Sequence, residues 1–181
     1  ARNVGFDKVK INSVLMRGRT ENELFDLVKF AKEKDILLRF IEMMPVSSKD
    51  VLNDLNFLPC GEVMNLLSQE FGRLKPLSDF KTNGPASYYS IPGRDQIIGF
   101  IGAMTNLKFC ESCNKLRLTC DGKLRPCLGS HLEFDLLKEI RSGATNDELK
   151  NFIREVVLRK PKAHDFRDNY QPDRKMIAIG G

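Results

Sequence analysis

Four of the chain's five cysteines lie close together in the stretch "FCESCNKLRLTCDGKLRPCL" at residues 109–128. They are Cys110, Cys113, Cys120 and Cys127. Thiols at this density can form disulfides, bind zinc or hold an iron–sulfur cluster. Because five cysteines are an odd number, they cannot all pair as disulfides. The spacing therefore predicts a metal site, and it remains to decide which thiols are ligands.

Within this stretch, "TCDGK" predicts a β-hairpin, because Asp-Gly between alternating strand residues is a strong turn signal. Two registers are open. A two-residue loop would pair Cys120 with Lys123. A three-residue loop, with Gly122 in the left-handed region, would pair Thr119 with Lys123.

In both registers Cys127 returns to the open end of the hairpin, beside Cys110 and Cys113, whereas Cys120 lies at the tip. Four strand residues at about 3.3 Å each separate the tip from the position of Cys127 by roughly 13 Å. A metal–sulfur bond is only about 2.3 Å long. We therefore expect Cys110, Cys113 and Cys127 to be ligands and Cys120 to be none.

Three cysteine ligands leave two kinds of site open. They suit a four-iron cluster with one open iron, whereas a closed structural zinc site has four ligands. His131, or Cys60 elsewhere in the chain, could be the fourth ligand of a zinc site. The spacing alone does not decide between cluster and zinc, since both accept thiolates.

Basic residues lie between the predicted ligands. Because side chains alternate along a strand, Lys115, Arg117 and Thr119 share one face. Beside a metal centre, the two charges would suit an anionic or carbonyl-rich ligand. The alternative is a solvated strand edge that carries two charges.

The composition is that of an ordinary globular protein, with 41% hydrophobic and 29% charged residues among 181. No apolar run approaches the roughly 20 residues of a membrane helix, and the first residues have no hydrophobic signal-peptide core. We therefore expect a cytoplasmic protein with no membrane partner. The net charge of +5 permits an anionic partner without requiring one.

The N-terminal elements that precede the cysteines predict a βαβ unit. Residues 8–16 and 36–44 are short β-branched and apolar runs typical of buried strands. Between them, residues 21–34 have helical periodicity after a capping box formed by Thr20 and Glu23. One such unit cannot cover both faces of its sheet, so we expect the chain to be the end of a longer barrel or sheet.

The remaining elements surround the cysteine stretch. Residues 61–71 predict a helix, and "SYYSI" and "QIIGFIG" predict an antiparallel hairpin around "PGRD". Two more helices are predicted after the cysteines, over 132–142 and 146–160. The second begins with a capping box at Thr145 and Glu148.

Five stretches together resemble one known family. They are "VGFDKVKIN", "RFIEMMP", the IPG-containing hairpin, the cysteine stretch and the terminal "IGG". In this order they resemble the GTP 3′,8-cyclases of the MoaA type, radical S-adenosylmethionine enzymes of molybdenum cofactor biosynthesis. The resemblance favours a cluster over zinc.

The resemblance implies an α/β fold. Residues 1–45 would be the last βαβ part of an incomplete (β/α) TIM-like barrel, and 46–181 an α+β region with antiparallel hairpins. That region would carry a C-terminal [4Fe–4S] cluster on Cys110, Cys113 and Cys127, with the open iron left for the guanine of GTP.

The resemblance also implies further site residues. Lys10 and Arg39 would contact the phosphates of GTP. Beside the substrate would lie Lys115, Leu116 and Arg117. Met44 would contact S-adenosylmethionine, and the tail formed by Gly180 and Gly181 would enter the active site. Lys115, Arg117 and the two glycines would be the catalytic positions. Lysine at 115 departs from the family's usual arginine and lacks the planar fork that makes paired hydrogen bonds.

The implied reaction converts GTP to (8S)-3′,8-cyclo-7,8-dihydroguanosine 5′-triphosphate in the first step of molybdenum cofactor biosynthesis. The full-length enzyme would use S-adenosylmethionine and a second [4Fe–4S] cluster. The implied partners are GTP, S-adenosylmethionine, a second copy in a homodimer and a downstream cyclic pyranopterin monophosphate synthase. The N-terminal Cys-x3-Cys-x2-Cys motif is absent from these 181 residues, so this part alone is expected to be inactive.

Two alternatives remain at the sequence level. One is the auxiliary-cluster region of another radical S-adenosylmethionine enzyme, although such enzymes usually carry more cysteines. The other is a zinc-ribbon module that binds nucleic acid. Aromatic residues are not interleaved with the basic ones in the hairpin, which disfavours nucleic acid as a partner.

Overall fold

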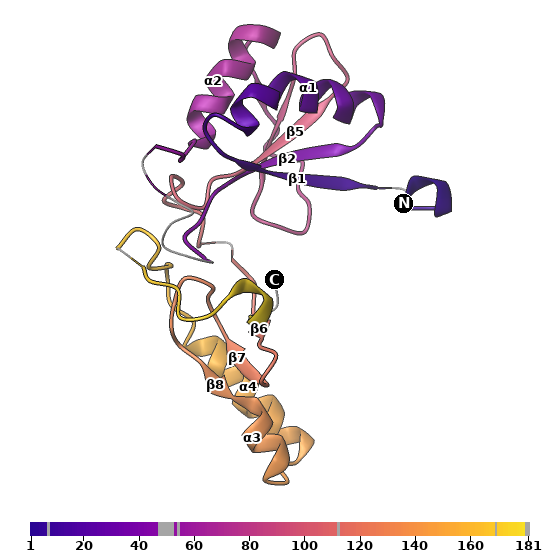
Figure 1. The fold of residues 1–181 in the computed structure, drawn as a ribbon. Coiled ribbons are helices and arrows are strands. Elements are labelled where there is room, and N and C mark those ends of the chain that lie inside the picture. Colours follow the sequence, from indigo (N-terminus) through magenta and orange to yellow (C-terminus); the bar gives the residue numbers. More distant parts are fainter. Residues whose placement is uncertain (7, 47–52, 54, 112, 169, 180–181) are drawn as a thin grey trace. The chain divides into compact units, whose positions relative to one another are not determined.

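The computed structural model describes residues 1–6, 8–46, 53, 55–111, 113–168 and 170–179 (Figure 1). The chain forms two compact units. The first comprises Ala1–Met44 with Leu52–Phe109, and the second comprises Pro45–Val51 with Cys110–Gly181. Residues 52–109 thus belong with the N-terminal residues, whereas the sequence had led us to group 46–181 together.

A five-stranded mixed sheet is the framework of the first unit and explains this division. Its strand order is β1-β2-β5-β4-β3. The strands are β1 (Lys10–Leu15), β2 (Leu37–Glu42), β3 (Lys75–Pro76), β4 (Ser87–Ser90) and β5 (Ile97–Ile101). Because β5 lies parallel to β2, the later strands extend the sheet that the first two begin.

The two predicted supersecondary motifs of this unit are confirmed. Helix α1 (Thr20–Glu33) connects β1 to β2, which pair in parallel as a βαβ unit. Strands β4 and β5 form the antiparallel hairpin around "PGRD".

Both helices of the first unit cover the same face of its sheet (Figure 1). Helix α2 (Cys60–Phe71) packs there beside α1. The core between helices and sheet includes Leu15, Leu24, Val28, Leu38, Phe40, Val63, Leu67 and Ile98, all almost fully buried. Each such side chain contributes about 1.5–3 kcal/mol of hydrophobic stabilisation.

The start of α1 differs from the sequence prediction. The capping box of Thr20 and Glu23 is wrong, because no side chain caps this helix and Thr20 is already its first residue. The Thr20 hydroxyl instead donates to the Val14 carbonyl at 2.6 Å. The Glu21 carboxylate accepts from the Gly18 amide at 3.1 Å. The Thr20 hydroxyl and the Glu21 carboxylate therefore form hydrogen bonds with the backbone before the helix instead of a capping box.

The second unit is built on a three-stranded antiparallel sheet of order β6-β7-β8. Its strands are β6 (Arg117–Leu118), β7 (Lys123–Arg125) and β8 (Phe134–Asp135). Arg117 pairs with Arg125, and the Thr119 amide donates to the Lys123 carbonyl at 2.9 Å. With Gly122 at φ +80°, the hairpin has the three-residue loop, the second of the two predicted registers.

Two helices follow this sheet, α3 (Leu136–Arg141) and α4 (Asn146–Leu158). The prediction of a helix from residue 132 is wrong, because Phe134 and Asp135 pair with β7 and the Asp135 carboxylate then caps α3. The capping box of Thr145 and Glu148 is confirmed at α4. Short 3₁₀ turns lie at Arg2–Val4 and Met176–Ala178.

The structure confirms a mixed α/β chain with one mixed and one antiparallel sheet. Among the described residues, no helix combines the length and the apolar composition that a bilayer span requires.

Candidate cysteine site

The three predicted cysteine ligands lie in the second unit and are partly buried. The Cys113 amide donates to the Cys110 carbonyl at 3.1 Å. Cys127 follows strand β7 at the open end of the hairpin. Burial raises the pKa of the Cys127 thiol, and charge on Cys110 and Cys113 raises it further. Cys127 therefore responds to charge on either of the other two thiols.

The other two cysteines lie elsewhere. Cys120 is exposed in the hairpin turn, and its amide donates to the Ala178 carbonyl at 3.1 Å. Cys60 belongs to the hydrophobic core of the first unit. Burial, followed by the charge on Glu42, raises the pKa of Cys60 to about 12. All five thiols are free.

His131, the other residue considered as a zinc ligand, is engaged by its neighbours. Its Nδ1 lies 3.4 Å from the Asp173 carboxylate, and its ring stacks on Tyr170 with centroids 4.9 Å apart. In the described parts of the chain, no three His, Cys, Asp or Glu side chains form a group ready to hold a single metal ion.

The donor chemistry nevertheless fits an iron–sulfur cluster. Such a cluster places several irons and sulfides between its thiolate ligands, so the sulfurs need not converge on one point. The chain offers two partly buried thiols before strand β6 and one after strand β7, which is the number of thiolates that such a cluster with one open iron takes. Cys110, Cys113 and Cys127 are the residues that would hold it.

The basic stretch beside the thiols alternates as predicted. Arg117 is half-buried and Thr119 is only 4% exposed, whereas Leu116 and Leu118 point outward. Lys115 precedes β6 and is exposed. Arg117 and Thr119 thus share the inward face of the hairpin.

Lys10 and Arg39 lie in the first unit, on the sheet face opposite the helices. Neighbours Leu38 and Phe40 pack in the helix-side core, so Arg39 between them points to the other face. Arg39 Nε donates to Asn12 Oδ1 at 2.8 Å, and Lys10 shares the face of Asn12. The structure therefore places the two cations on neighbouring strands of one face.

A glycine makes room for Arg39. Gly99 pairs with Arg39 across β2 and β5. A Cβ at this position would lie 2.9 Å from Arg39 Cγ and 2.8 Å from Tyr88 Cε1. Such contacts are too short, so only glycine fits beside the arginine.

Two further predicted positions have less structural context. Met44 is half-buried, two residues after strand β2. Gly180 and Gly181 lie outside the described residues. Lys10 and Arg39 belong to the first unit, whereas residues 115–117 belong to the second.

Glu42 is a buried carboxylate that the sequence reading missed. Its Oε1 accepts from the Cys60 amide at 2.9 Å and the Thr105 hydroxyl at 2.5 Å. Its Oε2 accepts from the amides of Met104 and Thr105 at 2.8 and 3.0 Å. Glu42 therefore fixes the start of α2 and the turn after β5. The signal was a charged residue inside the apolar run 36–44.

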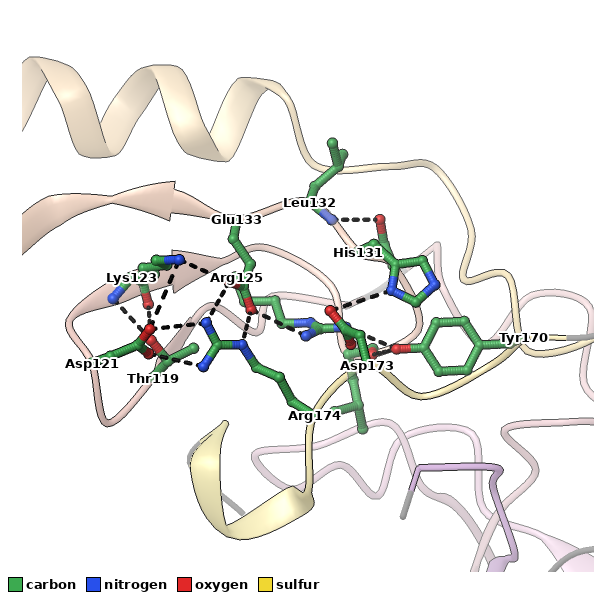
Figure 2. Close-up of polar contacts among 12 residues, drawn as sticks. Thr119, Asp121, Lys123, Arg125, His131, Leu132, Glu133, Tyr170, Asp173 and Arg174 are labelled. Carbon is green, nitrogen blue, oxygen red and sulfur yellow. Dashed lines mark hydrogen bonds and ion pairs between the residues drawn. The ribbon is translucent and has the colours of Figure 1, made fainter. Parts of the chain in front are cut away.

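Arg125 is a second missed residue, fully buried in the hairpin (Figure 2). Its guanidinium donates to the Tyr170 hydroxyl at 2.8 Å, Asp173 at 2.9 Å and Glu133 at 3.2 Å. The Tyr170 hydroxyl donates in turn to the Leu128 carbonyl at 3.2 Å, beside Cys127. Arg125 thus links the cysteine strand to the C-terminal segment.

Arg174 makes the second link between this segment and the hairpin (Figure 2). It forms ion pairs with Asp121 in the turn and with Glu133, whose Oε1 lies 2.7 Å from Arg174 Nε. Hydrogen bonds from Arg174, and another from Thr119, hold the pKa of Asp121 well below its usual range. The chain from Tyr170 to Ile179 is therefore attached to the hairpin by charge.

Comparison with known proteins places the chain among related sequences. Residues 36–166 match the family model described as Molybdenum Cofactor Synthesis C. A GTP 3′,8-cyclase of Desulforamulus reducens is 40% identical over 96% of this chain and 53% of its own length. One of Moorella thermoacetica is 37% identical over 98% of this chain and 54% of its own. The chain spans about half the length of the curated relatives it matches.

Proposed function

Because this chain belongs to the Molybdenum Cofactor Synthesis C family, we propose that it is the substrate-binding half of a GTP 3′,8-cyclase. The relatives that carry this name match it over about half their length. The complete enzyme would convert GTP to (8S)-3′,8-cyclo-7,8-dihydroguanosine 5′-triphosphate, the first step of molybdenum cofactor biosynthesis. These 181 residues lack the Cys-x3-Cys-x2-Cys motif, so alone they are expected to be inactive.

In this proposal Cys110, Cys113 and Cys127 hold a [4Fe–4S] cluster. The observation that carries it is the set of three partly buried, neighbouring thiols with neither His131 nor Cys60 among them. A closed zinc site would need a fourth ligand. When bound, the cluster would offer an iron without a protein ligand to the guanine of GTP.

The cations of the chain would bind the rest of GTP. Lys10 and Arg39 share one sheet face and would contact the phosphates, whose charge offsets their own. Lys115, Leu116 and Arg117 would lie beside the substrate near the cluster. Lys115 would bind as a single point charge, and Arg117 could make two parallel hydrogen bonds.

The wider proposal concerns the complete protein. The parallel strands β1, β2 and β5 would be part of an incomplete (β/α) barrel. Met44 would contact S-adenosylmethionine, which with a second [4Fe–4S] cluster supplies the radical chemistry of the full-length enzyme. Gly180 and Gly181 would enter the active site. The enzyme would be cytoplasmic and homodimeric, and cyclic pyranopterin monophosphate synthase would consume its product.

Anaerobic reconstitution with iron and sulfide tests the cluster. We expect about four irons per chain in the unmodified protein. Cys127→Ala should lose iron because it removes a ligand, whereas the matched Cys120→Ala should retain it. One zinc per chain with no uptake of iron would contradict the proposal, and equal loss in both variants would contradict the ligand set.

Equilibrium binding of GTP to the reconstituted chain tests the substrate. Arg117→Ala should weaken GTP binding about tenfold, equivalent to one charge-assisted hydrogen bond, without loss of iron. Arg141→Ala, an exposed arginine of the same unit, is the control. Equal competition by ATP and GTP would favour another radical S-adenosylmethionine enzyme, and a salt-dependent shift of unrelated RNA would favour a nucleic-acid module.

A further inference from the structure

Lys160 joins the two strands of the cysteine hairpin at its open end. The paired strands β6 and β7 end there at Arg117 and Arg125. Beyond them, Lys160 Nζ donates to the Lys115 carbonyl at 2.6 Å and to the Pro126 carbonyl at 2.5 Å. One ammonium group therefore bridges the strand that leads to Arg117 and the strand that leads to Cys127.

This contact differs from ordinary capping of a helix by a lysine. Lysines near a helix C-terminus often bond to the last carbonyls of their own helix. Helix α4 ends at Leu158, and both acceptors of Lys160 lie in the hairpin instead. The side chain thus fixes the hairpin rather than the helix that presents it.

Lys160 also brings a positive charge to the cysteine site. Its ammonium lies 2.5 Å from the carbonyl of Pro126, the residue before Cys127. In the described part of the chain, no carboxylate forms an ion pair with Lys160. The four carboxylates of the second unit that do form ion pairs there, Asp121, Glu133, Asp147 and Asp173, pair with Lys123, Arg125, His131, Lys150 or Arg174. The positive charge beside Cys127 is therefore not neutralised by these groups.

We propose that Lys160 is a positioning residue of the cysteine site, which sets the distance between the backbone at Lys115 and at Pro126 and places a positive charge beside the neighbouring Cys127 ligand. The inference rests on the proposed cluster and adds to it a residue outside the ligand set. Lys160 contacts Pro126, which precedes the proposed ligand Cys127, and Lys115, which lies on the proposed substrate side.

Two measurable consequences follow. Without the ammonium, two neighbouring carbonyls lose their shared donor, so the open end of the hairpin should loosen. A nearby cation also favours the more negative, reduced state of a cluster, because net charge and hydrogen bonding around the sulfurs set its reduction potential. Loss of Lys160 should therefore lower that potential.

The test compares Lys160→Met, which keeps most of the apolar stem, with Lys160→Arg, which keeps the charge. Lys162→Met is the matched control, because Lys162 is exposed two residues further along. Each reconstituted protein is measured for iron content, for the midpoint potential of the cluster and for hydrogen exchange of the amides at 117–125. We expect Lys160→Met to have a lower potential and faster exchange, Lys160→Arg to restore both, and the control to match the unmodified protein.

The outcomes separate this inference from the proposed function. If Lys160→Met retains iron with unchanged potential and unchanged exchange, the inference is wrong and the cluster stands. If the unmodified protein takes up no iron, the proposed function fails. Unchanged hydrogen exchange of the hairpin amides in Lys160→Met would then also exclude the structural role of Lys160. If Lys160→Met does not fold, the test rests on Lys160→Arg, which retains the charge. A midpoint potential in Lys160→Arg that differs from that of the unmodified protein would overturn the electrostatic role.

Discussion

Arg174 and Asp121 form a two-point ion pair, with Nη1 to Oδ1 at 3.0 Å and Nη2 to Oδ2 at 2.9 Å. The two residues are far apart in sequence, one in the C-terminal segment and one in the hairpin turn. The planar guanidinium matches both oxygens of the carboxylate at once, which fixes orientation as well as distance. Together with the contacts of Arg125, the pair therefore holds the C-terminal segment on the cysteine hairpin (Figure 2).

Reversal of one charge should release the segment. In Arg174→Asp, repulsion from Asp121 and Glu133 replaces attraction, so we expect faster hydrogen exchange of residues 170–179. Lys175→Asp makes the same charge change at an exposed neighbour and should have little effect. The double variant Arg174→Asp with Asp121→Arg should recover part of the protection. Equal exchange in Arg174→Asp and Lys175→Asp would contradict the role of the pair.

The same pair predicts how acid acts on the protein. Since the pKa of Asp121 is lower in the folded chain than its unfolded value of about 3.9, the folded state binds fewer protons. The resulting stabilisation is complete above that unfolded pKa and is lost as pH falls toward the folded one. Urea unfolding of Asp121→Asn should depend less on pH below about 4 than that of the unmodified protein. Parallel pH profiles would contradict this.

Sequence patterns predicted the elements better than their connections. The alternation and helical periodicity of residues 8–44 correctly gave β1, α1 and β2, because burial on one face repeats regularly. The same Ser/Thr-x-x-Glu pattern was right at Thr145 and wrong at Thr20, since the chain before each helix decides whether the side chain can cap it.

The charge network could not be predicted in the same way. A fully buried arginine is rare unless paired, and the partners Tyr170 and Asp173 of Arg125 lie in a segment without periodicity. The hairpin register was also open, because Asp-Gly suits both loops. The Thr119 hydroxyl accepts from the Lys123 amide at 2.9 Å, a side-chain contact that accompanies the three-residue loop.

Gly122 is required by both conformation and space. It has φ +80°, and a Cβ there would lie 2.5 Å from Leu137 Cβ. Gly143 has a similar φ of +87° but open space around it, so it is a matched control. We expect Gly143→Ala to lose about 1–2 kcal/mol of unfolding free energy from strain alone. Gly122→Ala should lose more, and its iron uptake should fall because the hairpin shifts. Equal losses would mean that the contact with Leu137 yields freely.

Glu42 should be the most sensitive carboxylate of the first unit. It is 1% exposed and accepts four hydrogen bonds through two oxygens. In Glu42→Gln, one oxygen becomes an amide nitrogen that faces donors, so buried amides lose their acceptor. We expect a loss of about 2–4 kcal/mol in the free energy of unfolding, measured by urea titration.

The control for Glu42 is Glu23→Gln, the same chemical change at an exposed position of α1. It should leave the unfolding midpoint almost unchanged. Hydrogen exchange in Glu42→Gln should rise first at Cys60, Met104 and Thr105, whose amides lose their acceptor, before it rises in the core of α1. A uniform rise across the first unit would instead indicate global destabilisation without the local role assigned to this carboxylate, and an unchanged midpoint would contradict the assignment altogether.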